Sequence, residues 1–226
     1  VHLVRNGLGS DRITVRGTGD GLEVWADVTV RVPADATITA ALGVGELRAA
    51  GLTGEAILDT HAAAITVDDH TGRLLCDTGG GAVTVTDHGG GELTVDTGSG
   101  PVAIARAETT KLLVDTGSGA VDARAIGADR VLVDTGSGAV HLDLARLGTG
   151  RSQVDTGSGD VRVELPAAAD LTISVDTGSG AITTDLPGAT VVQRERSELR
   201  LRLGGGTGHL HVDTGSGGVT LARRSL

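Results

Sequence analysis

The sequence lacks almost every residue type that builds a thick core or cross-links a small fold. In 226 residues there is no Phe, Tyr or Met, and there are only one Trp, one Cys and four Pro. Large rings fill thick cores. A chain without them needs a narrow interior that Val, Leu, Ile and Ala can fill. The single Cys76 excludes an intrachain disulfide, and we expect it to be a small apolar side chain within a strand.

Basic charge and long apolar runs are also scarce. The formal net charge is −10, which argues against nucleic acid as a partner because phosphate binding needs a basic face. No run of about 20 apolar residues is present, so we expect no transmembrane segment in this chain. The sequence begins with Val1 rather than Met, which leaves open whether a leader or an anchor precedes it.

Glycine is abundant, at 37 residues, and much of it belongs to a repeated pentapeptide, DTGSG. Weaker copies, DTHAA and DTGGG, begin at Asp59 and Asp77. The full copies begin at Asp96, Asp115, Asp134, Asp155, Asp176 and Asp213. Successive copies are 18 to 21 residues apart, except for the last step of 37, which is about twice the others.

Two interpretations of this motif compete. Asp-Thr-Gly-Ser is the active-site signature of pepsin-like aspartic proteases, which need two such loops whose carboxylates share a proton. Eight copies at a near-constant spacing do not fit that requirement. A fixed period near 20 residues is instead typical of a solenoid, in which each repeat packs on its neighbours. The repetition therefore excludes the protease.

One repeat, GELTVDTGSGPVAIARAETT (91–110), shows how each turn is built. Apolar and polar residues alternate over 93–97 and again over 102–105, which predicts two strands. The Gly-Ser-Gly stretch at 98–100 predicts a tight turn, where glycine permits positive φ. The polar residues 106–110 predict a looser turn into the next copy.

Neither strand can bury its apolar face alone, so equivalent strands must stack. We expect an all-β fold: a parallel β-solenoid of about ten right-handed turns, with two main strands in each turn of 18–21 residues. In-register apolar columns support this interpretation. One column is Val95, Val114, Val133, Val154, Val175 and Val212. The other is Val83, Val102, Val121, Val140, Val161, Ile182 and Val219.

The chain is expected to form a single domain, 1–226. Residues 1–50 would supply a cap and degenerate turns, and a strand at 22–33, with Trp25 and ended by Pro33, would close the core. Within them, Ala41 aligns with the motif aspartates. Residues 51–185 would form the regular turns. Residues 186–226 would form a degenerate Arg-rich turn followed by the final turn.

The opening VTVRVPADATITAALGVGELRAAGLTG, the iterated VDTGSG and the closing LRLGGGTGHLHVDTGSGGVTL resemble the bacterial DUF4097 family of adhesin-like proteins. The resemblance covers nearly the whole chain. It implies a β-solenoid of the cell envelope, often fused to a membrane segment or anchored beside one, with no established catalytic residues. It also implies a location on the periplasmic or extracellular face.

Stacking would place the motif aspartates in one column outside the core, about 5 Å apart. At this spacing neighbouring carboxylates repel by just under ~1 kcal/mol per pair in water, so the column needs compensation. We expect each carboxylate to accept hydrogen bonds from the Gly and Ser amides of its own turn. Ca²⁺ between adjacent turns is the alternative, although one carboxylate per turn falls short of the six to eight oxygens that calcium prefers. The column comprises Asp59, Asp77, Asp96, Asp115, Asp134, Asp155, Asp176 and Asp213.

Two Asp-His pairs form a second group of candidate residues. Asp69-His70 and Asp87-His88 are 18 residues apart, one turn of the coil, so they should stack where the second strand ends. Two imidazoles and two carboxylates so placed could bind Zn²⁺ or a similar ion. A polar loop explains the four residues more simply, and we expect no metal or other cofactor.

Basic residues gather towards the C-terminus of an otherwise acidic chain. A solvated face whose arginines pair with Glu195 and Glu198 is one explanation. A docking patch for an anionic partner is the other, formed by Arg194, Arg196, Arg200 and Arg202. Arg223 and Arg224 add to the same charge in the sequence.

Together these features favour a non-enzymatic scaffold of the bacterial envelope, whose loops and faces contact a protein or an envelope surface. Self-assembly is an alternative, because solenoid ends expose unpaired strand edges that invite homo-oligomers or bactofilin-like filaments. A Ca²⁺-stabilised surface protein and an accessory subunit on a membrane complex are further alternatives. A polysaccharide-active enzyme fits poorly, because the chain has no Phe or Tyr on which a sugar could stack.

Overall fold

A computed structural model describes residues 2–6, 10–14, 27–33 and 35–225, and their side chains from residue 27 onwards. The chain divides into two compact units, Val1–Val32 and Pro33–Leu226. In the first unit β1 (His2–Asn6) and β2 (Ser10–Thr14) form an antiparallel hairpin. Trp25, expected to cap the core, lies outside the described residues.

The predicted strand at 22–33 is wrong in its described part. Residues 27–33 form no strand, and the side chains of Val28 and Val30 are 49% and 68% exposed. An alternating apolar pattern forms a stable strand only where a partner supplies hydrogen bonds and a surface to cover. None of the described strands pairs with this segment.

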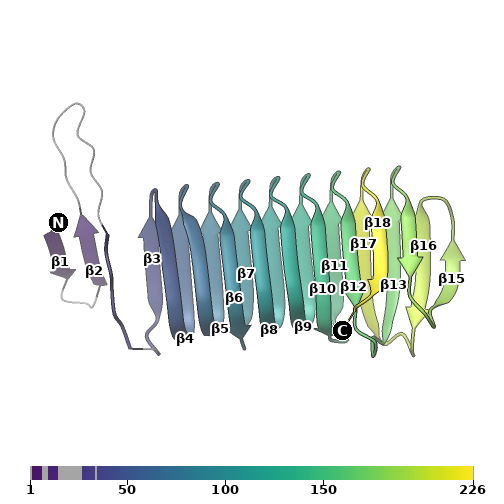
Figure 1. The fold of residues 1–226 in the computed structure, drawn as a ribbon, viewed down its shortest axis with the longest axis horizontal. Helices are drawn as coiled ribbons and strands as arrows, with labels where there is room; N and C mark the ends of the chain where they lie inside the picture. Colours follow the sequence, from purple (N-terminus) through teal and green to yellow (C-terminus); the bar gives the residue numbers. More distant parts are fainter. Residues whose placement is uncertain (1, 7–9, 15–26, 34, 226) are drawn as a thin grey trace. The chain divides into compact units, whose positions relative to one another are not determined.

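The second unit is an all-β solenoid, with no helix among its described residues. In Figure 1 its strands stack side by side as successive rungs. They are β3 (Ile38–Leu42), β4 (Glu46–Thr60), β5 (Ala64–Thr78), β6 (Val83–Gly89), β7 (Glu92–Thr97), β8 (Val102–Thr116), β9 (Val121–Thr135), β10 (Val140–Leu147), β11 (Arg151–Thr156), β12 (Val161–Leu165), β13 (Leu171–Thr177), β14 (Ile182–Asp185), β15 (Thr190–Arg194), β16 (Glu198–Leu203), β17 (Gly208–Thr214) and β18 (Val219–Arg223).

Equivalent residues of successive turns pair in parallel and in register, as predicted. Asp96 pairs with Asp115, and Val102 with Val121. Ala41 pairs with Asp59, which confirms its place in the motif column. The turn length is about 19 residues, and there are about seven turns, fewer than the ten expected. We call the side that carries the motif the motif side, and the side that begins after it, at residues such as Val102, the second side.

The segment predicted as a looser turn, 106–110, is part of a strand. β8 runs through it to the next motif, and β4, β5 and β9 do the same in their turns. The chain bends where one residue adopts a left-handed conformation: Asp69 in β5, Asp87 in β6 and Arg106 in β8 have φ of 53°, 55° and 55°. The backbone beyond the bend pairs with its neighbours again, so it forms a short third side of the coil.

The last turn of the chain is not the last turn of the solenoid. β17 inserts between β11 and β13, so Asp213 stacks between Asp155 and Asp176. On the second side β18 inserts in the same way between β12 and β14. Figure 1 shows the insertion as two yellow strands among green ones. Sequential stacking was therefore the wrong prediction for this part of the chain.

The expected degenerate Arg-rich turn is also wrong. Residues 190–203 form a hairpin, β15–β16, and β16 pairs antiparallel with β13 at the end of the stack. The hairpin has no copy of the motif, and it ends the parallel coil. A register shift beside Val192 marks a β-bulge in β15. Bulges of this kind obstruct further pairing along an edge strand.

The core is filled by Val, Leu, Ile and Ala, as expected for a chain without Phe or Tyr. Both predicted columns are buried except at Ile182, which is partly buried, and Leu and Ala residues complete the interior. Cys76 stacks between Leu58 and Val95 and is fully buried, and this burial raises the pKa of its thiol to about 12. The expectation of an apolar role for Cys76 is confirmed.

The motif turn is closed by its threonine rather than by its aspartate. The Thr116 Oγ1 accepts a hydrogen bond from the Gly119 amide at 2.9 Å, and Thr97, Thr135 and Thr156 do the same in their own turns. In several turns the hydroxyl also donates to a glycine carbonyl of the adjacent turn, as Thr214 does to Gly159 at 3.2 Å. A buried ladder of hydroxyl groups thus connects the turns.

The motif glycines allow the backbones of adjacent turns to stack closely. None of those that begin or end a DTGSG turn has positive φ, contrary to our expectation. A Cβ on Gly119 would lie 1.9 Å from the carbonyl oxygen of Gly100 in the adjacent turn, and one on Gly117 would lie 2.5 Å from that of Gly98. Glycine is required here because any side chain would collide with the neighbouring backbone.

Candidate interaction face

The motif aspartates form a continuous row on the outside of the coil, here called the aspartate row. Pairing in register brings Asp59, Asp77, Asp96, Asp115, Asp134, Asp155, Asp213 and Asp176 into this order. Most of these side chains are exposed. Among the described residues no backbone amide donates to any of them, so the expected Asx-type arrangement is wrong. The buried threonine accepts the hydrogen bond from the backbone amide of the turn, and the aspartate points to solvent.

Repulsion along this row perturbs its carboxylates. Burial, followed by the charges of Asp77 and Asp115, raises the pKa of Asp96 above its usual value. The pKa of Asp134 is raised for the same reasons, with Asp115 and Asp155 as its neighbours. One partial compensation is a hydrogen bond from Gln153 Nε2 to Asp155 Oδ2 at 2.6 Å. Backbone pairing therefore keeps these carboxylates close together even though they repel one another.

Removing one charge from the middle of the aspartate row should stabilise the protein. For Asp96→Asn we expect the free energy of unfolding at pH 7 and low salt to rise by about 1 kcal/mol, because two like-charge contacts disappear. The gain should shrink at 1 M salt, where such contacts are screened. Urea denaturation at both salt concentrations measures it.

The matched control for this variant is Asp185→Asn. Asp185 is exposed on the second side, where its neighbour in β18 is Ala222. It has no carboxylate beside it in that strand, so its replacement should leave stability nearly unchanged. An equal gain in both variants would show that net charge, and not the row, is responsible.

Two further rows lie beside the aspartate row on the motif side. The central row, two residues before the aspartates, is partly buried and mostly apolar over Ile57, Leu75, Thr94, Leu113 and Leu132, followed by Gln153. The basic row, two residues earlier again, runs Glu55, Arg73, Glu92, Lys111, Arg130 and Arg151. We call these three rows together the aspartate face. Sequence reasoning identified only its aspartates.

The basic row is compensated at one end only. Arg73 pairs with Glu55, and Lys111 Nζ lies 2.5 Å from Glu92 Oε1. Arg130 and Arg151 are exposed and form no ion pair with any described residue. At adjacent rungs the face therefore carries unpaired cations on one edge and unpaired carboxylates on the other.

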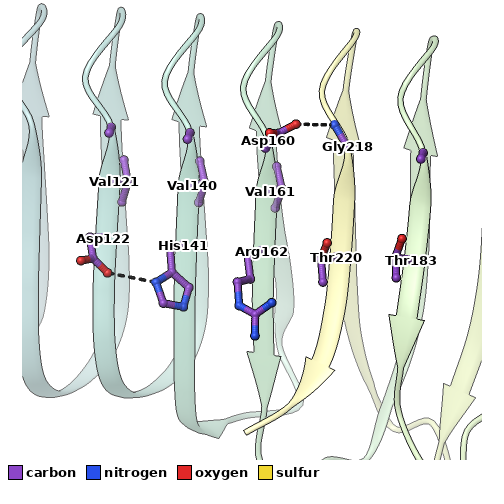
Figure 2. A pocket seen from close by; sticks show the side chains of 13 residues that line it. Val121, Asp122, Val140, His141, Asp160, Val161, Arg162, Thr183, Gly218 and Thr220 are labelled. Carbon is purple, nitrogen blue, oxygen red and sulfur yellow. Dashed lines mark hydrogen bonds and ion pairs between the residues drawn. The ribbon is translucent and has the colours of Figure 1, made fainter.

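The second side offers a different surface, a shallow groove of about 560 Å³ that crosses β9, β10, β12, β18 and β14. Figure 2 shows Asp122, His141 and Arg162 in line across three of these strands. His141 Nδ1 lies 3.2 Å from Asp122 Oδ1, and Arg162 donates to Glu164 at 2.7 Å. Arg124 also pairs with Asp122, at 2.9 Å.

The charges of this groove are largely satisfied by one another. Asp143, on the same side, pairs with Arg224 at 2.5 Å. At the groove's far edge Asp160 accepts a hydrogen bond from the Gly218 amide at 2.7 Å, which Figure 2 also shows. The second side is thus a compensated network, whereas the aspartate face keeps its charges separate. For this reason the aspartate face is the stronger candidate for binding.

The hypothesis of a metal site at Asp69, His70, Asp87 and His88 is wrong. The left-handed bend at each aspartate turns the following histidine inwards, so both imidazoles are at most 2% exposed while both carboxylates face solvent. Asp87 instead binds Arg106 through two hydrogen bonds of 2.6 and 2.9 Å, which lowers the pKa of Asp87. Across the described residues no three carboxylate, imidazole or thiol groups gather in a metal-binding arrangement.

The two histidines contact each other within the core. Their rings stack with centroids 5.3 Å apart, and the two Nδ1 atoms are 3.3 Å apart. The Nε2 atoms of both are buried and have no hydrogen-bond partner. Burial lowers the pKa of His70, and burial together with the charge of His70 lowers the pKa of His88 to about 4.

The C-terminal arginines separate into two groups. Arg194, Arg196, Arg200 and Arg202 are exposed in and around the β15–β16 hairpin at the end of the stack. Their role as an anionic docking patch stays a prediction. Arg223 instead donates to the carbonyls of Pro166, Ala167 and Pro187, and Arg224 pairs with Asp143. These two hold the inserted C-terminal strand in place.

The geometry defines a class of protein, a parallel β-solenoid. Its repeated turns stack through threonine hydrogen bonds and through close backbone contacts at glycine. The sequence profile of the Toastrack DUF4097 family matches residues 25–222, and the chain belongs to this family. No curated protein and no solved structure shows a match. Among the described residues there is no helix long and apolar enough to cross a membrane.

Proposed function

We propose that this chain is a non-enzymatic interaction module of the bacterial cell envelope, a rigid scaffold that presents the aspartate face to a partner. The observation that carries the proposal is the pattern of charge. Three rows run side by side over adjacent turns: carboxylates, mostly apolar side chains, and a basic row whose cations are consecutive from Lys111 to Arg151. The outer rows lack internal partners at Asp115, Asp134, Arg130 and Arg151. The family resemblance supports the envelope location, on its periplasmic or extracellular face.

The fold suits this role because its rigidity comes from repetition. Each turn pairs with its neighbours through the backbone and through the threonine ladder, so the positions of the outer side chains are fixed along the coil. A partner would therefore meet charges at a constant spacing of about 4.8 Å. Such a surface can be recognised by a partner whose charges have the same spacing, and this recognition does not require a cleft.

Site-specific photo-crosslinking in the bacterium that encodes the full-length protein tests the proposal. A photoreactive residue replaces Leu113 in the central row or, as the control, Ala103, which is exposed on the second side of the same strand. We expect the protein in the envelope fraction and crosslinked products from position 113 only. Recovery in the cytoplasmic fraction, or equal labelling from both positions, would contradict the proposal.

A further inference from the structure

Adjacent rungs of the aspartate face repeat the same order of side chains. From basic to acidic edge they read Lys111-Leu113-Asp115 and then Arg130-Leu132-Asp134. The next rung, Arg151-Gln153-Asp155, keeps the order with an amide in the centre. Because residues along a strand are about 3.3 Å apart, the cation and the carboxylate of one rung are separated by about 13 Å. They are too distant to neutralise each other directly.

A surface with this order is complementary to itself. If a second copy faces it across a two-fold axis parallel to the solenoid axis, the order of rows is reversed in the partner. Each basic row then lies over the partner's aspartate row, and the two central rows meet on the axis. Arg130 of one copy would face Asp134 of the other, and Leu132 would face its own equivalent. A two-fold axis along the strands would instead place aspartate over aspartate, so charge selects the first arrangement.

We propose that the aspartate face binds a second copy of this chain in a parallel, two-fold symmetric dimer. The inference rests on the proposed function, because it names the partner of the same face. The rungs with Lys111, Arg130 and Arg151 form its centre, since their cations lie opposite Asp115, Asp134 and Asp155. The rungs with Glu55 and Glu92 contribute less, because their glutamates dilute the basic row there.

The dimensions of the face agree with a stable dimer. Six rungs carry all three rows, and β17 and β13 extend the aspartate row by two more. At about 4.8 Å per rung and about 20 Å per six-residue strand, these eight rungs give a face of about 770 Å². Specific interfaces bury about 800 Å² per partner. Partly buried leucines at the centre with charges at both edges also match the usual arrangement of an apolar interface core and a polar rim.

Exchange of charge between the two outer rows provides the test. Sedimentation equilibrium of the full chain at low salt should show a wild-type dimer that weakens as salt is added. Arg130→Glu and Asp134→Arg should each weaken the dimer at least tenfold, because each places like charges opposite one another. An equimolar mixture of the two single variants should dimerise again, and so should the double variant.

The control is Arg124→Glu, which makes the same charge change on the second side of the same strand. It should leave dimerisation unchanged, and circular dichroism melts of all variants establish that each is folded. A wild-type chain that stays monomeric at all concentrations, or single variants that fail to associate when mixed, would overturn the dimer. Such a monomer that still crosslinks to another envelope component through position 113 would leave the proposed function intact.

Discussion

Replacing Gly119 with alanine is expected to destabilise the solenoid by at least about 3 kcal/mol. The new Cβ would lie 1.9 Å from the Gly100 carbonyl oxygen and 2.7 Å from Thr116 Oγ1. Both atoms belong to the stacked backbone or to the threonine ladder, so neither can move without separating two turns. The cost should appear as a lower urea midpoint or as failure to fold.

Gly80→Ala is the matched control, because Gly80 occupies the position that serine takes in the other motifs. Its Cβ would meet only Ser99 Oγ, at 3.6 Å, an ordinary contact. We expect a change within about 0.5 kcal/mol. The two substitutions are chemically identical and lie in equivalent turns. Equal losses of stability would show that close stacking is not the reason for glycine at position 119.

The sequence predicted the columns of this fold because their period is regular, but it could not predict their order at the C-terminus. Val154, Val175 and Val212 precede identical pentapeptides. Any of the three turns can therefore stack on any other with the same contacts. The observed order depends on the β15–β16 hairpin, which covers β13 and leaves the chain to return between β11 and β13. The stacking order is therefore determined by tertiary packing, and a local sequence pattern does not predict it.

The candidate site was also only partly predictable. The aspartate row follows directly from the repeat. The same alignment of copies places Arg130 and Leu132 in rows of their own, so the repeat also contains the signal for the other two rows. The inward histidines were not predictable from alternation. A left-handed residue at Asp69 or Asp87 shifts the phase of the strand by one, so His70 and His88 enter the core. Asp tolerates this conformation, which was the available signal.

Acidification is expected to destabilise the protein through these two histidines. The pKa of His88 is about 4 in the folded state against 6.5 in a free side chain, and the pKa of His70 is lowered as well. Between pH 6.5 and pH 4 the unfolded chain therefore binds more protons than the folded one. The free energy of unfolding should fall as pH decreases through this window, by about 3 kcal/mol at pH 4 from His88.

The double variant His70→Leu/His88→Leu isolates this contribution. In the column that contains the two histidines, Leu52 is the neighbour of His70 and Ala107 is the neighbour of His88. No charged side chain therefore borders the pair inside the core. The charged groups nearest in the chain, Asp69, Asp87 and Arg106, are exposed and remain in the variant. The variant should lose most of the stability change between pH 6.5 and pH 4, as measured by urea denaturation.

Two features make the comparison decisive. Raised pKa values at Asp96 and Asp134 act in the opposite direction, because acid relieves their repulsion, so only the difference between wild type and variant reports the histidines. His61→Gln, which removes an exposed imidazole, should keep the wild-type pH dependence. Parallel pH curves for wild type and the double variant would mean that the buried pair accepts a proton without cost. That outcome requires a solvated cavity, which is incompatible with two imidazoles at most 2% exposed.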